Sequence, residues 1–213
     1  MKLILPERSL LKRTNDVDYF HWNYKFPIKY VQLYRFKTIA KLLGSKIYGH
    51  LLEVGTGSGI FLPELARHCE KLYACDVHPH FEEIDNLAKH HKFNNYELKS
   101  QSIEKTDYTD NQFDAIVAVS VLEFVDDLQA AINEIKRILK NDGVFLTICP
   151  MQNKMLDFIL SFYIDKKVEE EFGDARIYVT KALEQNFKVI KKGYMIPLIG
   201  KLFPVYTHYK LMK

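Results

Sequence analysis

The stretch His50-Leu-Leu-Glu-Val-Gly-Thr-Gly-Ser-Gly59 decides the fold of this chain. Its apolar first half has the character of a buried strand, and glycines follow at the alternate positions 55, 57 and 59. Glycines at the end of a strand let the backbone turn sharply and let a ligand approach without meeting a Cβ atom. The residues after Gly59 predict a short helix from Ile60 to about His68, whose N-terminus would offer unpaired N–H groups to a carboxylate or phosphate. The stretch therefore predicts a nucleotide-binding turn.

A second strand, 71–75, is predicted next, and it ends at Asp76. Asp76 lies nineteen residues after Gly57, where an acidic side chain can accept hydrogen bonds from both hydroxyls of a ribose. A dinucleotide-binding motif would place a Gly or Ala at position 60, where this chain has Ile60. A P-loop is excluded because no Gly-Lys-Ser/Thr follows the turn.

Short apolar runs then alternate with amphipathic helices, which is typical of βαβ units and a mostly parallel sheet. The strongest helix signal covers 127–140, with Asp126 or Asp127 as its cap and Gly143 as a stop. An aromatic-rich arm, 19–26, and a helical stripe that ends at Gly44 precede the first strand. Further strands are predicted at 96–99, 113–119, 144–148, 189–196 and 205–211, and further helices at 81–88, 154–172 and 178–186.

Taken together, these motifs resemble those of the class I S-adenosylmethionine-dependent methyltransferases. The segment 51–59 resembles the first motif of that family, and Asp76 stands where its ribose-binding acid stands. The segment 113–125 resembles the fourth-strand motif, and 139–148 resembles the motif that joins a helix to the fifth strand. The motifs occur in the family's order, and they point to its small-molecule branch, similar to the ubiquinone and menaquinone methyltransferases.

This resemblance implies an α/β fold with a doubly wound, seven-stranded, mostly parallel sheet of the Rossmann-like methyltransferase type. It implies a last strand inserted antiparallel, near 205–211, and a helical and aromatic cap (1–46) on a cofactor-binding domain (47–213). The cofactor would be S-adenosylmethionine, and the product S-adenosylhomocysteine. The positions that match cofactor-binding positions of the family are Glu53, Gly55, Thr56, Gly57, Gly59, Asp76, Val77, Ser102, Ile103 and Ser120.

The chain departs from the family at two positions. Phe124 stands where many small-molecule members carry a His, and Gln101 stands where the adenine loop often has an acid. A base is needed only if the acceptor must lose a proton, and the sequence leaves Glu123, His21 and Tyr19 as candidates, each with a structural role as the alternative. Side chains expected at the acceptor are Trp22, Tyr24 and Phe124.

Composition narrows the class of protein. No apolar run is long enough to span a membrane, and three cysteines without a CxxC pair predict reduced thiols in the cytoplasm. The eight histidines form no metal-binding pattern, so we expect no metal.

The two ends of the chain are basic. Residues 1–50 carry a net charge of +7 and residues 181–213 a net charge of +6, which leaves −10 for the middle of a chain whose total is +3. The two basic ends therefore predict a shared surface or partner, with solubility as the alternative.

The sequence thus favours methylation of a small, apolar or lipid-like acceptor. An RNA or protein methyltransferase that uses the basic termini stays open as an alternative, as does a cofactor-binding domain without catalysis. We expect a monomer or a homodimer, and we expect a nucleic-acid partner least because no recognition motif is present. The apolar segments 155–164 and 194–205 predict an acceptor pocket or a peripheral membrane contact, or else a core or dimer interface.

Overall fold

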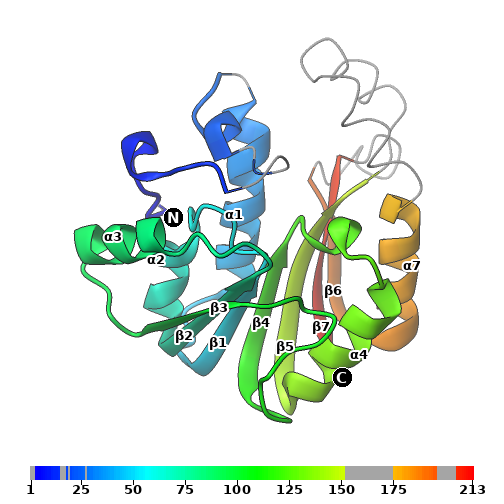
Figure 1. Cartoon of the computed structure of the whole chain (residues 1–213). Coiled ribbons are helices and arrows are strands. Elements are labelled where there is room, and N and C mark those ends of the chain that lie inside the picture. Colours follow the sequence, from blue (N-terminus) through cyan, green and yellow to red (C-terminus); the bar gives the residue numbers. More distant parts are fainter. Residues whose placement is uncertain (1–2, 15–17, 19, 27, 152–174, 196–204) are drawn as a thin grey trace.

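A seven-stranded sheet forms the centre of the computed structural model, which describes residues 3–14, 18, 20–26, 28–151, 175–195 and 205–213. The strand order is β3-β2-β1-β4-β5-β7-β6 (Figure 1). The strands β1 to β5 pair in parallel, whereas β7 is antiparallel to both β5 and β6, as predicted. Their bounds are β1 Tyr48–Val54, β2 Cys69–Asp76, β3 Tyr96–Ser100, β4 Phe113–Val119, β5 Leu139–Pro150, β6 Lys188–Tyr194 and β7 Tyr206–Met212.

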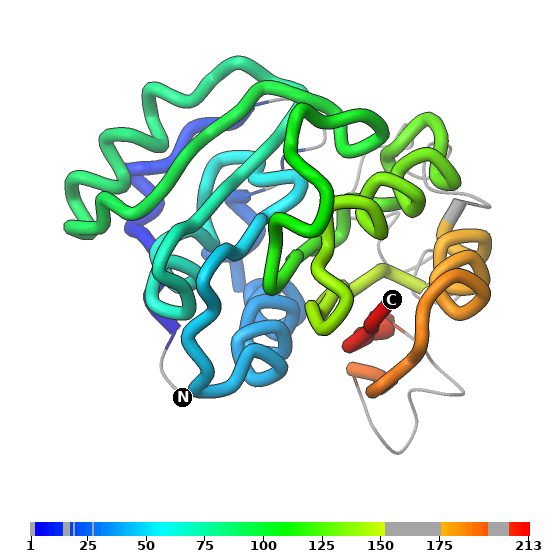
Figure 2. The backbone as a smooth tube through the Cα atoms, turned by 90° about the horizontal axis from the view of Figure 1, so that it is seen from below, coloured from blue at the N-terminus to red at the C-terminus, as the bar shows by residue number. Residues whose placement is uncertain are grey.

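Helices cover both faces of the sheet, which confirms the doubly wound architecture (Figures 1 and 2). The first face carries α1 (Lys29–Leu43), α2 (Leu62–Leu65) and α3 (Glu82–His91). The second face carries α4 (Leu128–Ile138) and α7 (Ala175–Asn186). Short 3₁₀ turns complete the described elements: η1 (Arg8–Leu10), η2 (Phe20–Asn23), η3 (Ala66–His68) and η4 (Leu122–Phe124).

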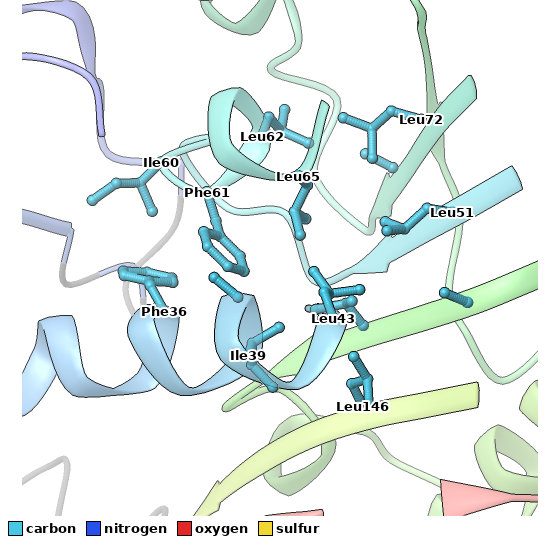
Figure 3. Close-up of a cluster of buried hydrophobic side chains, with 14 of the residues drawn as sticks. Phe36, Ile39, Leu43, Leu51, Ile60, Phe61, Leu62, Leu65, Leu72 and Leu146 are labelled. Carbon is cyan, nitrogen blue, oxygen red and sulfur yellow. The ribbon is translucent and has the colours of Figure 1, made fainter. Parts of the chain in front are cut away.

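The core on the first face explains why α1 docks against the sheet. Its side chains Phe36, Ile39 and Leu43 are spaced by three and four residues, so they share one face of the helix. Figure 3 shows them packed against Phe61 and Leu51, and all five are buried. Full burial of one such side chain stabilises the fold by about 1.5–3 kcal/mol. Because α1 leads directly into β1, this packing brings the start of α1 to the edge where β1 and β4 end (Figure 1).

The helix with the strongest sequence signal is present, with one difference at its end. Asp127 is its N-cap, and the Asp127 carboxylate accepts a hydrogen bond from the Ala130 N–H at 2.9 Å. The helix stops at Ile138 rather than Lys140, because Leu139 already pairs with Phe113 as the first residue of β5. The register then shifts to Val144 opposite Ala115, so the residues up to Gly143 bulge out of the ladder instead of following the helix as a loop.

Two other predictions differ from the structure or cannot be compared with it. The helix expected from Ile60 to His68 is two short pieces, α2 and the 3₁₀ turn η3. The helix predicted at 154–172 and most of the apolar segment 194–205 lie outside the described residues. The remaining predicted strands and helices are present within a few residues of their expected ends.

Candidate functional site

The glycine-rich turn between β1 and α2 requires glycine at all three positions. The φ angles of Gly55, Gly57 and Gly59 are 71°, 52° and 77°, a region that side chains with a Cβ atom rarely adopt. At Gly55 an added Cβ would also lie 2.8 Å from the Cβ of Val121, which follows β4. The turn and the loop after β4 are therefore packed directly on each other, and the carboxyl ends of β1 and β4 form one site.

The N–H groups of this turn are already used inside the protein. Gly55 and Thr56 donate to the Cys75 carbonyl at 2.9 and 3.4 Å, and Gly59 donates to the Thr56 carbonyl at 3.0 Å. In α2, the Leu62 N–H donates to the Gly59 carbonyl at 3.1 Å, and the helix has only four residues. The N–H groups of α2 itself are used in local hydrogen bonds, because Leu62 donates to the Gly59 carbonyl and both Glu64 and Leu65 donate to the Phe61 carbonyl.

Asp76 and His78 hold the Gly57 peptide from its two sides. The Asp76 carboxylate accepts the Gly57 N–H at 2.8 Å, and the His78 ring nitrogen Nε2 lies 3.0 Å from the Gly57 carbonyl. The other ring nitrogen, Nδ1, lies 3.1 Å from the His80 N–H. A carbonyl can only accept and an N–H can only donate, so His78 must be neutral with its proton on Nε2 to make both bonds. The turn is thus fixed before any ligand binds.

Three carboxyl groups gather around the same turn. Asp18, in the N-terminal arm, lies 3.8 Å from the position of a Cβ at Gly57. Burial raises the pKa of Asp18, and Asp76 raises it further, although bonds from Thr14 and Phe20 oppose this shift. Glu53 is fully buried, and burial followed by the charge of Asp76 holds its pKa well above the usual range. Three neighbouring carboxyl groups suit a ligand that carries positive charge and disfavour the pyrophosphate of a dinucleotide.

The positions expected around the adenine lie at the ends of β2 and β3. Val77 follows Asp76 and its side chain is 70% exposed, so an apolar surface is open beside this acid. The Ser102 hydroxyl donates to Glu104 at 2.9 Å. Ile103 is only 4% exposed and belongs to the core on the second face, so it supports this loop from beneath. Gln101 is joined to the site by its own N–H, which donates to the Asp76 carbonyl at 2.9 Å.

The loop after β4 presents buried polar atoms at the opposite side of the site. Ser120 has a φ of 54°, and its buried hydroxyl has no hydrogen-bond partner among the described residues. Glu123, in η4, is buried, and neither of its carboxylate oxygens has such a partner. Burial raises the pKa of Glu123 to about 7, although the charges of Arg35 and Arg176 lower it. Arg35 comes from α1 and Arg176 from α7, so Glu123 lies where elements of both faces meet.

The expected catalytic and acceptor residues fall into separate environments. His21 lies in η2, and burial and the charges of Arg8, Arg13 and Lys25 lower its pKa. The cations that act on Glu123 are instead Arg35 and Arg176, so the two candidate bases lie in different charged surroundings. Trp22 follows His21 in an edge-to-face ring contact, with 6.1 Å between the ring centroids.

The remaining expected catalytic and acceptor residues are Tyr24, Phe124 and Tyr19. The Tyr24 hydroxyl donates to the Pro6 carbonyl at 2.5 Å, and burial raises its pKa to about 12, so this phenol is tied up within the arm. Phe124 is 37% exposed at the end of η4. Tyr19 lies outside the described residues.

Sequence reasoning missed His78 and Asp18 as neighbours of the glycine turn. His78 carries a local signal, because a His two residues after the acid at a strand end can fold back on the glycine turn. Asp18 carries no such signal, since thirty-nine positions separate it from Gly57 and only the packing of the arm joins them.

No helix in the described part of the chain is long and apolar enough to cross a membrane. In that same part, no three His, Cys, Asp or Glu side chains are grouped so that they could hold a metal ion.

Comparison with known proteins agrees with this geometry. Residues 52–147 match the family described as "Methyltransferase domain". The chain is also 24% identical over 191 residues to the ubiquinone/menaquinone biosynthesis C-methyltransferase UbiE of Zymomonas mobilis, a match that covers 80% of this chain and 79% of that protein. Residues 52–147 thus match a methyltransferase domain, and the chain as a whole has the fold of known methyltransferases.

Other similar proteins show how widely this methyltransferase fold is shared. The ribosomal protein L11 methyltransferase of Dictyoglomus turgidum is 32% identical over 113 residues, which cover 52% of this chain and 36% of that protein. The N-methyltransferase NodS of Bradyrhizobium japonicum, solved with S-adenosylhomocysteine, has a TM-score of 0.62 and 17% identity, with 93% of this chain and 94% of NodS covered.

Proposed function

We propose that this methyltransferase methylates a small, apolar or lipid-like acceptor. The observation that carries the proposal is a set of exposed apolar side chains at the edge where the acceptor would enter. Phe124 belongs to the loop after β4, and Ile177 and Tyr178, which are 51% and 63% exposed, lie in the first turn of α7 beside it. Phe26 and Tyr30, at the start of α1, are 71% and 61% exposed. Apolar surface on both sides of an acceptor entrance suits an apolar molecule.

Each residue of the cofactor site receives a role in this proposal. Asp76 would hold the ribose hydroxyls, Val77 would pack on the adenine, and Glu53 would act indirectly at the amino group of the methionine part. The cofactor, when bound, supplies a methyl group on a positively charged sulfur. The contribution of the protein is to align the acceptor with that methyl group and to exclude water.

Glu123 is the general base in this proposal. It is buried after the end of β4, neither of its oxygens has a hydrogen-bond partner in the described part of the chain, and its pKa of about 7 suits proton removal near neutral pH. An acceptor that must lose a proton, such as a phenol or an enol, would place its hydroxyl against this carboxylate. His21 and Tyr19 stay alternative candidates, and Trp22, Tyr24 and Phe124 are proposed to line the acceptor.

The proposed cap, residues 1–46, closes this site from the side of the glycine turn. Asp18 lies against Gly57, the Ile4 N–H donates to Glu64 at 2.8 Å, and Lys12 pairs with Glu83 at 2.7 Å. These contacts join the arm to α2 and α3, which follow the two cofactor-binding strands.

The experiment has two stages. The affinities for S-adenosylmethionine and S-adenosylhomocysteine are first measured by calorimetric titration, with NADH as the control ligand. Methyl transfer from labelled cofactor is then measured on phenolic and quinol-like small molecules, on total RNA and on intact ribosomal protein. Turnover of the small apolar molecules alone supports the proposal. Turnover of RNA or protein alone refutes it, and cofactor binding without any turnover favours a binding domain.

A further inference from the structure

Two segments without acidic residues lie side by side in the fold. Residues 19–52 contain six Lys and Arg residues and no Asp or Glu, and residues 185–213 contain six Lys and no Asp or Glu. The Tyr34 hydroxyl of α1 joins them, because it donates to the Tyr194 carbonyl at 3.0 Å and lies 3.3 Å from His208 Nδ1. This contact places α1 beside the C-terminal strands β6 and β7.

The lysines of this surface repel one another. Lys37 and Lys41 are four positions apart on α1, and Lys191 on β6 lies directly opposite Lys210 on β7. Like charges at either spacing destabilise a helix or a sheet. None of these four lysines has an ion pair within the described residues, whereas Lys192 on the other face of β6 pairs with Glu184 at 2.7 Å.

The strand register places Lys191 and Lys210 on the face that α1 covers. Tyr209 and Leu211 join the core beneath α4 and α7, so the alternating residues His208 and Lys210 face the other way. Burial and then the charges of Lys191 and Lys41 lower the pKa of His208, which shows that positive charge from both elements converges there.

An aromatic pair continues the lysine stripe along α1. Tyr30, Lys37 and Lys41 differ by seven and four residues, so they share one side of the helix, and Phe26, which precedes the helix, contacts the Tyr30 ring. The buried face of α1 is the opposite one. Exposed aromatic rings beside lysines are typical of protein surfaces that contact the boundary between lipid headgroups and acyl chains.

We propose that this methyltransferase docks on an anionic membrane surface through its basic face, defined by Phe26, Tyr30, Lys37, Lys41, Lys191 and Lys210. The lysines supply the attraction to anionic headgroups, and the two rings reach the acyl boundary next to the acceptor entrance. The choice of a lipid surface rests on the proposed lipid-like acceptor and on the geometry of the rings.

That geometry disfavours an RNA strand as the partner. Phe26 and Tyr30 contact each other edge to face at a centroid distance of 6.1 Å, and the Lys29 ammonium lies 5.3 Å over the Tyr30 ring. A nucleic-acid base stacks on an open ring face, and here the rings are turned toward each other and toward a lysine.

The test is co-sedimentation of the full chain with vesicles of phosphatidylcholine alone or with phosphatidylglycerol, without cofactor or acceptor. We expect binding only to the anionic vesicles and release by high salt. The double variant K191E/K210E should weaken binding about 30-fold or more, because each lysine near such a surface contributes about 1 kcal/mol and a tenfold change corresponds to about 1.4 kcal/mol. The matched control K105E/K181E changes two exposed lysines by the same charge and should bind as the wild type does.

A second variant tests the rings. F26A/Y30A should bind more weakly than the wild type but keep the preference for anionic vesicles. It should also lose the blue shift of a fluorescence probe whose emission reports insertion into the lipid. Equal binding to both vesicle types, an equal loss in K105E/K181E, or binding to RNA but not to vesicles would overturn the proposal. No acceptor is present in this assay, so a lack of vesicle binding would contradict the membrane proposal without contradicting the proposed methyl transfer. Conversely, an acceptor screen without turnover would not contradict the vesicle binding.

Discussion

The neutral His78 side chain offers the sharpest test of how the cofactor site is held in place. Its Nε2 proton bonds the Gly57 carbonyl and its Nδ1 accepts the His80 N–H, at 3.0 and 3.1 Å. Two substitutions separate these bonds. In His78→Gln the terminal amide reaches as far as Nε2 and can still donate to Gly57. In His78→Asn the side-chain oxygen replaces Nδ1, but no donor reaches the glycine turn.

The expected effect follows from the bond that is lost. A polar group left without its partner in a partly buried site costs about 1–3 kcal/mol. The Gly57 peptide is held at its N–H by Asp76 and at its carbonyl by His78, so loss of the second bond loosens the turn that binds the cofactor. At about 1.4 kcal/mol for each factor of ten, His78→Asn should weaken S-adenosylhomocysteine binding about tenfold, and His78→Gln should weaken it less than threefold.

Calorimetric titration with S-adenosylhomocysteine gives the affinity, and thermal unfolding of the cofactor-free protein gives the stability. His80→Ala is the control, because the His80 backbone N–H remains when the exposed ring is removed. Nitrogen-15 shifts of the His78 ring should report a protonated Nε2 and an unprotonated Nδ1. Equal affinities of His78→Asn and His78→Gln, or a melting temperature that falls in step with affinity in both, would contradict a positioning role.

Three further predictions concern the same site. Asp76→Ala should weaken cofactor binding by more than tenfold while circular dichroism stays unchanged; an unchanged affinity would remove its assigned role. Gly55→Ala should destabilise the fold by about 2 kcal/mol or more in urea unfolding, because of its φ of 71° and its contact with Val121, and V121A should recover part of that loss. The pKa of about 7 at Glu123 predicts a rate that falls below pH 7 in the wild type and loses this limb in Glu123→Gln. Since burial raises that pKa above the unfolded value, the folded state binds the proton better between about pH 4.5 and 7. The contribution of Glu123 to wild-type stability should therefore fall by up to about 3 kcal/mol as the pH rises through this range, and Glu123→Gln should lose this contribution.

Most of the elements that build the cofactor site are predictable because their signals are local. The strand Phe113–Val119 has the predicted bounds, since a continuous apolar run predicts a strand that is covered on both faces. The cap Asp127 is a one-residue signal with a local bond to Ala130. The alternate glycines of the turn report the positive φ angles directly. The antiparallel position of β7, in contrast, came from resemblance to a family, because a strand's apolar pattern does not state its direction.

Predictions failed where a feature depends on a partner that is distant in the sequence. The register shift that brings Leu139 into β5 depends on its pairing with Phe113. Asp18 reaches Gly57 only because the arm folds over α2 and α3. The exposure of Phe26 and Tyr30 likewise depends on which face of α1 the sheet buries.

The sequence by itself therefore determined the kind of fold, the glycine turn and the acid Asp76, because each depends on residues within a few positions of one another or on spacing along the chain. Only the tertiary structure decided that His78 and Asp18 close on that turn, that the Glu123 carboxylate is buried without a hydrogen-bond partner among the described residues, and that Lys191 faces Lys210 beside α1. Burial and strand register are properties of contacts between segments far apart in the chain, and the free energies that shift a pKa or make two lysines repel arise only when those segments meet.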